Sequence, residues 1–149
     1  MTVYFIGAGP GDPELMTIKG QRLLDAAPVV LFAGSLIPEE NMDTARSRGA
    51  LVVDTAALAL DAQVELMADA HAKGQHVARL HSGDPSLYGA IGEQIRRLEA
   101  LDIDYQIIPG VMATSASAAW LGKELTLSGV SQTLILTRYE GKTPFPERE

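Results

Sequence analysis

Short apolar runs alternate along the chain with longer segments in which apolar side chains recur every three or four residues. The runs are four or five residues long and rich in Val, Ile, Leu and Phe, which is typical of buried strands. Most end at Gly, Pro, Ser or Asp. They lie at Val3–Ile6, Val29–Phe32, Leu51–Asp54, Val77–His81 and Tyr105–Ile108. The alternation predicts an α/β fold with a mainly parallel sheet flanked by helices.

Helical spacing fills the intervals between the predicted strands. Ile18–Ala27 carries Leu23 and Leu24 on one side, and two later segments place apolar residues three and four positions apart. These two are centred on Val64 to His71 and on Ile91 to Leu98. A fourth helix, Ala113–Leu121, is small and apolar almost all round, so we expect it to be buried between layers. Gly122 is expected to end it.

The pattern changes after Leu125. Residues 131–137, SQTLILT, predict a new strand, and the segment that follows is turn-rich and charged. We therefore expect residues 1–124 to form an N-terminal α/β domain. Residues 125–149 are expected to be a linker and the first strand of a truncated second α/β domain.

Composition narrows the possible partners. The 149 residues include 12 Lys and Arg against 19 Asp and Glu, a net charge of −7 that disfavours nucleic acid. The absence of cysteine excludes thiol chemistry and disulfides. The N-terminal residues resemble no signal peptide, because they have no basic flank, no apolar stretch of signal length and no small-residue cleavage site. A cytoplasmic protein without membrane or nucleic-acid partners is the expectation.

The tripeptide Gly-Asp-Pro occurs twice, at 11–13 and 83–85, each time between a predicted strand and a predicted helix. In an open parallel sheet this is the edge where ligands bind. The first turn, GAGPGDPE, fails as a dinucleotide fingerprint because Asp12 stands where a third glycine is required. A carboxylate in each turn also disfavours phosphate.

Two interpretations of these turns remain open. Asp12 and Asp84 can simply cap helices that begin at Pro13 and Pro85. However, the glycines of the first turn exceed what a cap needs, and they indicate a backbone that something approaches closely. A ligand with positive charge and hydroxyls fits such an acidic rim. S-adenosylmethionine fits, although composition alone does not distinguish it from other nucleosides.

Longer motifs resemble a known family. The chain contains YFIGAGPGDPELMTIKG at 4–20, LFAGSLIP at 31–38, LHSGDPSLYGAIGEQ at 80–94, IIPGV at 107–111 and LGKELTLSGVSQTLILTRYEGKTP at 121–144. In this order, and covering nearly the whole chain, they resemble the tetrapyrrole methyltransferases of cobalamin synthesis. They look most like the subgroup that methylates ring carbon 11 of precorrin-4 or cobalt-precorrin-4.

The resemblance implies two α/β domains with the cofactor between them, and usually a homodimer. It implies S-adenosylmethionine as cofactor, S-adenosylhomocysteine as product, and a tetrapyrrole substrate. Transferred position by position, it implies that cofactor contacts come from Pro10, Ser82, Gly83, Asp84, Leu87, Met112 and Ala113. It places the Asp12 and Ser35 loops on the substrate side. Tyr88, three residues beyond the second turn, can stack on an adenine or a pyrrole ring or pack within its own turn.

This sequence departs from the family in two respects. Family members commonly carry two hydroxyl residues after the Pro-Gly-Val turn, where this chain has Met112 and Ala113. They also run roughly a hundred residues further, completing a second domain. We therefore expect weak cofactor binding and poor turnover from these residues alone.

No residue stands out as a catalyst. A sulfonium methyl group is intrinsically electrophilic, so methyl transfer needs mainly positioning and desolvation. His81 can act as a base, but a strand-end histidine bonded to backbone is the simpler interpretation. No metal is expected, because no His, Asp or Glu pair has ligand spacing with a third partner in view. The alternatives are a methyltransferase for another tetrapyrrole carbon (uroporphyrinogen III or a neighbouring precorrin), a nucleotide-binding oxidoreductase, and a domain that only binds a nucleoside.

Overall fold

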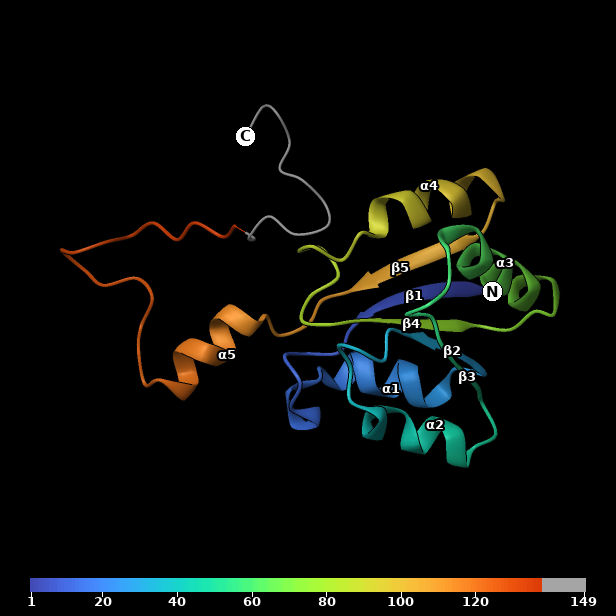
Figure 1. Cartoon of the computed structure of the whole chain (residues 1–149), viewed down its shortest axis with the longest axis horizontal. Coiled ribbons are helices and arrows are strands. Elements are labelled where there is room, and N and C mark those ends of the chain that lie inside the picture. Colours follow the sequence, from blue (N-terminus) through green and yellow to red (C-terminus); the bar gives the residue numbers. More distant parts are fainter. Residues whose placement is uncertain (138–149) are drawn as a thin grey trace. The chain divides into compact units, whose positions relative to one another are not determined.

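A five-stranded parallel sheet forms the centre of the fold (Figure 1). The structure is a computed structural model that describes residues 1–137. The strands follow the order β3-β2-β4-β1-β5, and every pair is parallel. Their bounds are β1 Thr2–Gly7, β2 Val29–Phe32, β3 Leu51–Asp54, β4 Val77–His81 and β5 Asp104–Ile108. The predicted α/β class and all five predicted strands are confirmed.

Helices cover both faces of the sheet, which is why its central strands read as continuous apolar runs. α1 (Ile18–Ala26) and α2 (Asp43–Ser47) lie on one face, and α3 (Leu60–Ala72) and α4 (Ile91–Ala100) lie on the other (Figure 1). Each face has its own buried cluster. One includes Ile6, Leu24 and Phe32, and the other Phe5, Met67 and Leu98. Complete burial of each such side chain contributes about 1.5–3 kcal/mol.

Short elements and caps complete the N-terminal half. The Asp12 carboxylate accepts a hydrogen bond from the Glu14 amide at 2.9 Å, so its predicted capping is confirmed. It caps only a 3-10 turn, η1 (Pro13–Leu15), because α1 starts later, with Thr17 capping the Gly20 amide at 3.1 Å. A second 3-10 turn, η2 (Glu39–Met42), precedes α2. The sequence pattern had indicated neither η2 nor α2.

Asp84 does not cap a helix, which corrects the second capping interpretation. Residues 85–88 form turns, and α4 begins only at Ile91, with Ala90 as its first flanking residue. Both Tyr88 and Ala90 adopt left-handed backbone, with φ of 56° and 49°. Such conformations interrupt a right-handed helix and delay its start.

Beyond Pro109 the predictions are met in part. α5 (Ala113–Trp120) forms, and Gly122 ends it with φ of 62°. Its predicted burial is wrong: of its residues only Ala118 is buried within the described structure. The strand predicted at 131–137 is also absent from the described residues, where Ser131 forms only an isolated bridge with Leu127. A strand needs a neighbour to bond with.

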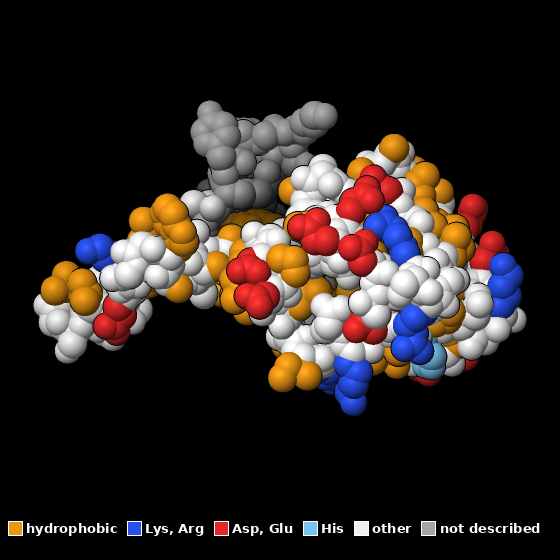
Figure 2. Space-filling model, turned by 90° about the horizontal axis from the view of Figure 1, so that it is seen from below, with side chains coloured by type: hydrophobic (Ala, Val, Ile, Leu, Met, Phe, Trp, Pro, Cys, Tyr) orange, Lys and Arg blue, Asp and Glu red, His pale blue; other side chains and the backbone are white. Residues whose placement is uncertain are grey.

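Two compact units divide the chain, Met1–Ala116 and a second beginning at Ser117. The predicted boundary at 124/125 stays a prediction, and residues 138–149 of the predicted second domain lie outside the described residues. No helix within residues 1–137 is long and apolar enough to cross a membrane. On the face that Figure 2 shows, basic side chains are interspersed with acidic ones.

Candidate functional site

Three loops meet at the carboxyl edge of the sheet. They follow the adjacent strands β4, β1 and β5, and they comprise residues 82–90, 8–17 and 109–112. The chain leaves β1 toward α1 on one face and leaves β4 toward α4 on the other (Figure 1). Neighbouring strands whose connections diverge in this way create the crevice where open α/β sheets bind ligands.

Glycine allows the three loops to approach one another. A Cβ atom on Gly7 would lie 2.5 Å from the Gly110 Cα and 2.6 Å from the Gly83 carbonyl oxygen. A Cβ atom on Gly110 would likewise collide with the Gly83 oxygen and lie 2.7 Å from the Gly7 Cα. No other residue type fits at these two positions without moving backbone.

Backbone hydrogen bonds join the first two loops. The Gly83 amide donates to the Gly9 carbonyl at 2.7 Å, and the Gly9 amide donates to the Gly83 carbonyl at 3.3 Å. The Ala8 amide donates to the His81 carbonyl at 2.8 Å. The β1 and β4 ladder therefore continues one step beyond the sheet through an isolated antiparallel bridge.

The Asp84 carboxylate joins the second and third loops. Its Oδ2 accepts a hydrogen bond from the Gly110 amide at 2.9 Å, and its Oδ1 accepts one from the Ser86 amide at 2.8 Å. Partial burial raises the pKa of this carboxyl group, but the hydrogen bonds from Gly110 and Ser86 outweigh it and the net pKa is lowered. The ionised side chain thus holds the edge together, and lone pairs remain free for a further donor.

The structure gathers the residues that the resemblance assigns to the cofactor. Ser82, Gly83, Asp84 and Leu87 share one loop. Met112 approaches that loop, since a Cβ atom on Gly83 would lie 3.9 Å from the Met112 Cα. Pro10 follows the Gly9–Gly83 bridge directly, and Ala113 begins α5. Whether these residues contact a cofactor stays a prediction.

The residues assigned to the substrate side are more scattered. Asp12 is exposed and occupied with its own turn. Ser35 is exposed in the loop after β2, and Tyr88 is 58% exposed in the loop after β4. These two loops share a cavity, because Leu36 and Tyr88 both line it. The structure therefore brings the Ser35 and Tyr88 loops together and leaves Asp12 on another loop.

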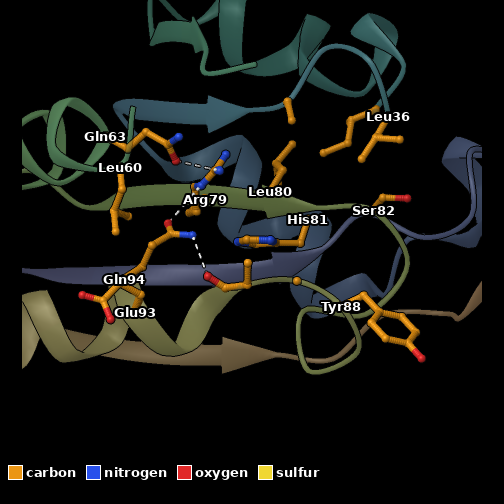
Figure 3. A pocket seen from close by; sticks show the side chains of 14 residues that line it. Leu36, Leu60, Gln63, Arg79, Leu80, His81, Ser82, Tyr88, Glu93 and Gln94 are labelled. Carbon is orange, nitrogen blue, oxygen red and sulfur yellow. Dashed lines mark hydrogen bonds between the residues drawn. The ribbon is translucent and has the colours of Figure 1, made fainter. Parts of the chain in front are cut away.

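That cavity, of about 410 Å³, lies beneath the end of β4 (Figure 3). Arg79 and His81 line it and point to the same face of their strand. Sequence reasoning missed Arg79, although a charged residue within the apolar run Val77–His81 was the signal. Burial lowers the pKa of His81 to about 3, with the positive charge of Arg79 acting in the same direction and a Gly89 backbone hydrogen bond opposing it. His81 is thus neutral near pH 7, bonded to backbone rather than poised as a base.

Within residues 1–137 no group of three or more His, Asp or Glu side chains is arranged to hold a metal ion.

The chain is similar to known proteins along its whole length. A family model described as tetrapyrrole (corrin/porphyrin) methylases matches residues 2–148. The precorrin-4 C(11)-methyltransferase of Pseudomonas aeruginosa is 62% identical over 149 residues, which are 100% of this chain and 59% of that protein. The cobalt-precorrin-4 C(11)-methyltransferase of Methanocaldococcus jannaschii is 48% identical over 147 residues, covering 99% of this chain and 56% of that protein.

Solved structures have the same fold. The X-ray structure of a cobalamin biosynthetic enzyme, cobalt precorrin-4 methyltransferase, is 48% identical with a TM-score of 0.92, covering 99% of this chain and 62% of that one. The uroporphyrin-III C-methyltransferase of Thermus thermophilus, complexed with S-adenosylhomocysteine, is 34% identical with a TM-score of 0.72. That alignment covers 89% of this chain and 53% of the other.

This chain spans only 56% to 60% of the length of the methyltransferases from Pseudomonas aeruginosa and Methanocaldococcus jannaschii and of a third one, from Rhodococcus erythropolis. The family model nevertheless covers nearly every residue, and the fold matches that of a solved cobalt precorrin-4 methyltransferase with a TM-score of 0.92. The chain belongs to the tetrapyrrole (corrin/porphyrin) methylase family.

Proposed function

We propose that this protein transfers a methyl group from S-adenosylmethionine to ring carbon 11 of precorrin-4 or cobalt-precorrin-4, in the synthesis of cobalamin. The observation that carries the proposal is the 62% identity, over all 149 residues, to a precorrin-4 C(11)-methyltransferase. The shared part comprises the three-loop edge described above. Because this part is only 59% of that relative, the activity is proposed and not read from the fold.

The loops of this chain fit the proposed cofactor. Residues 7–17, 82–90 and 109–115 contain no Lys or Arg and carry the carboxylates of Asp12, Glu14 and Asp84. Such a rim suits a cationic ligand without phosphate. Gly83, with φ of 62°, has room for a methyl group, whose nearest neighbours would be the Met112 Cα and the Val111 oxygen, both at 3.9 Å. We propose that the cofactor is held by the predicted set, Pro10, Ser82, Gly83, Asp84, Leu87, Met112 and Ala113.

Positioning is the main task of these residues. S-adenosylmethionine supplies an electrophilic methyl group, so the chain has to orient the substrate carbon and exclude water. Asp84 serves this indirectly, because its carboxylate holds the Gly110 loop against the Gly83 loop. Tyr88 and the Ser35 loop border the cavity beneath β4, and we propose that the substrate side of the site lies there. No proton carrier is assigned, and no metal takes part in the proposed reaction.

A second candidate is methylation of another tetrapyrrole carbon. The uroporphyrin-III C-methyltransferase of Thermus thermophilus has the same fold at 34% identity, so the fold does not select the ring position. The higher identity to the carbon-11 enzymes favours the first candidate.

The setting of the protein is part of the proposal. We propose a cytoplasmic homodimer that acts on a small molecule and binds neither nucleic acid nor membrane. The net charge of −7 supports the exclusion of nucleic acid.

Calorimetric titration with S-adenosylhomocysteine and with NAD tests the cofactor. The titrations use this chain and a version extended to the full length of its relatives. We expect S-adenosylhomocysteine to bind, more tightly to the extended version, and NAD not to bind. Binding of NAD alone would refute the methyltransferase assignment. Turnover of precorrin-4 in preference to uroporphyrinogen III, measured with the extended version, tests the ring position.

A matched pair of variants tests the site. Gly83 and Gly74 both have left-handed backbone, with φ of 62° and 67°, and space for a methyl group. Alanine at either position strains the backbone by about 1–2 kcal/mol, but only Gly83→Ala places a methyl group at the three-loop edge. We expect weaker S-adenosylhomocysteine binding in Gly83→Ala and unchanged binding in Gly74→Ala. Equal affinities would contradict the predicted contact.

A further inference from the structure

Arg79 is a buried cation without a carboxylate partner. Its side chain extends from the centre of β4, and the residue is only 6% exposed. No Asp or Glu among the described residues lies within ion-pair distance, although five such pairs form elsewhere. Burial lowers the pKa of the guanidinium to about 10, so the group is still charged at neutral pH. An unpaired buried charge is costly, and folded proteins seldom keep one without a use.

Neutral side chains hold the guanidinium in place. Nη1 donates to the Thr55 hydroxyl at 3.0 Å, Nη2 donates to Gln63 Oε1 at 3.0 Å, and Nε donates to Gln94 Oε1 at 3.3 Å. These three bonds use three of the five N–H donors of an arginine. The group is therefore fixed in orientation, while its charge and two donors remain available to a ligand.

The cavity beneath β4 gives a ligand access to this charge. Arg79, Gln63 and Gln94 line it from the inner side, and Leu36 and Tyr88 line it toward the loops (Figure 3). A second unsatisfied group belongs to the same wall: His81 is 8% exposed, and its Nε2 atom has no hydrogen-bond partner in the described structure. Buried polar atoms are normally paired, and in a neutral His81 that donates to the Gly89 backbone the Nε2 atom is an acceptor, so this orphan indicates that a hydrogen-bond donor, on a ligand or on a water molecule that accompanies it, completes the cavity.

The carboxylates near the cavity are already engaged. Glu93 lines the wall, but it pairs with Arg96 and Arg97 on its own helix. Asp54 precedes Thr55, and its Oδ1 accepts hydrogen bonds from the amides of Gly34 and Ala56. Neither reaches Arg79, so the charge that would balance the guanidinium has to come from outside the described residues.

We propose that the cavity beneath β4 binds a carboxylate side chain of the tetrapyrrole substrate, with Arg79 as the residue that recognises it. This inference rests on the proposed function, because uroporphyrinogen-derived rings carry acetate and propionate arms. A planar guanidinium with two free donors matches a carboxylate. The methionine carboxylate of the cofactor is the other source of the same chemistry, and the test separates the two.

Fluorescence titration with uroporphyrin III, a non-reactive tetrapyrrole octacarboxylate, measures the contact. We expect Arg79→Met to weaken binding by about tenfold to a hundredfold, the usual effect of removing a charge-assisted hydrogen bond. Arg79→Lys keeps the positive charge but loses the planar guanidinium that can donate two hydrogen bonds to one carboxylate. Its affinity for uroporphyrin III is therefore expected to lie between that of the unmodified protein and that of Arg79→Met. Arg46→Met is the matched control, because it removes an exposed arginine from α2 and is expected to change nothing.

A second measurement does not depend on the variants folding well. In the unmodified protein, the Nε–H resonance of Arg79 is expected to shift when uroporphyrin III is added and to remain in place when S-adenosylhomocysteine is added. A shift with S-adenosylhomocysteine alone would assign the cavity to the cofactor and overturn the proposal.

Parallel titration with S-adenosylhomocysteine, using the version extended to the full length of the relatives, separates this inference from the proposed function. If S-adenosylhomocysteine binds but uroporphyrin III does not, or binds equally well without Arg79, the carboxylate site is refuted and the methyltransferase stands. If uroporphyrin III binds through Arg79 and S-adenosylhomocysteine does not bind, the carboxylate site stands and the methyltransferase is refuted. If neither binds, both are refuted.

Discussion

Alanine at Gly7 is the most direct test of the three-loop edge. The added methyl group would lie 2.5 Å from the Gly110 Cα and 2.6 Å from the Gly83 oxygen, so backbone has to move by more than half an ångström. Overpacking of this kind costs about 1–3 kcal/mol. The movement also stretches the Asp84–Gly110 and Gly9–Gly83 hydrogen bonds, which contribute about 1 kcal/mol or more each. We expect a loss of about 3 kcal/mol in the free energy of unfolding.

Urea unfolding followed by circular dichroism measures this loss, which corresponds to a melting temperature lower by about 6–12 °C. Gly92→Ala is the matched control. Gly92 lies in α4 with nothing within 4 Å of the added methyl group, so alanine there is expected to stabilise the protein by about 0.5–1 kcal/mol. If Gly7→Ala unfolds within 1 kcal/mol of the unmodified protein, the close approach of the three loops is wrong.

Three further outcomes follow from the same contacts. Asp84→Asn puts an amide donor opposite one of the two backbone amides that the carboxylate binds. We expect the free energy of unfolding in urea to fall by about 1–2 kcal/mol and S-adenosylhomocysteine to bind more weakly. Unchanged values would show that the carboxylate does not hold the loops. In the folded protein the pKa of His81 is about 3, below its value in the unfolded chain. As the pH drops below about 6.5, the unfolded state therefore takes up a proton that the folded state does not. The free energy of unfolding is expected to fall by up to about 1.4 kcal/mol per pH unit. His81→Gln should flatten this dependence between pH 7 and pH 5, and an equal slope in both proteins would contradict the assignment. Thr17→Ala removes the cap from the Gly20 amide and is expected to cost about 0.5–2 kcal/mol in the same assay, whereas no change would mean that α1 does not depend on this cap.

Local patterns were reliable guides to the N-terminal fold. The bounds of β2, β3 and β4 agree with prediction to the residue. For β2 and β4 the reason is that every residue of the strand is buried, which requires a nearly continuous apolar run. Where burial had no such local signature, prediction failed. α5 is apolar but mostly exposed among the described residues, and Asp84 precedes a proline as a helix cap would, yet no helix starts there.

In the candidate site, too, some features were predictable from local sequence and others were not. Gly7, Gly83, Asp84 and the Pro109–Gly110 turn were all conspicuous in the sequence, since each follows a predicted strand. Their mutual contacts were not, because residues 26 and 103 positions apart meet only once the strand order β4-β1-β5 is set. Arg79 is the opposite case: it interrupts a predicted apolar strand, but only the structure shows that it lies beside a cavity without a counter-charge among the described residues.

The sequence by itself determined the α/β class, the five strands and the family, because each depends on short-range periodicity or on the order of motifs along the chain. Only the tertiary structure decided which groups act together. The Asp84 carboxylate joins the backbone of its own loop to that of another, His81 is neutral because it is buried, and Arg79 has only neutral partners. These properties arise from desolvation and from contacts between distant segments, and neither is encoded in the neighbours of a residue along the chain.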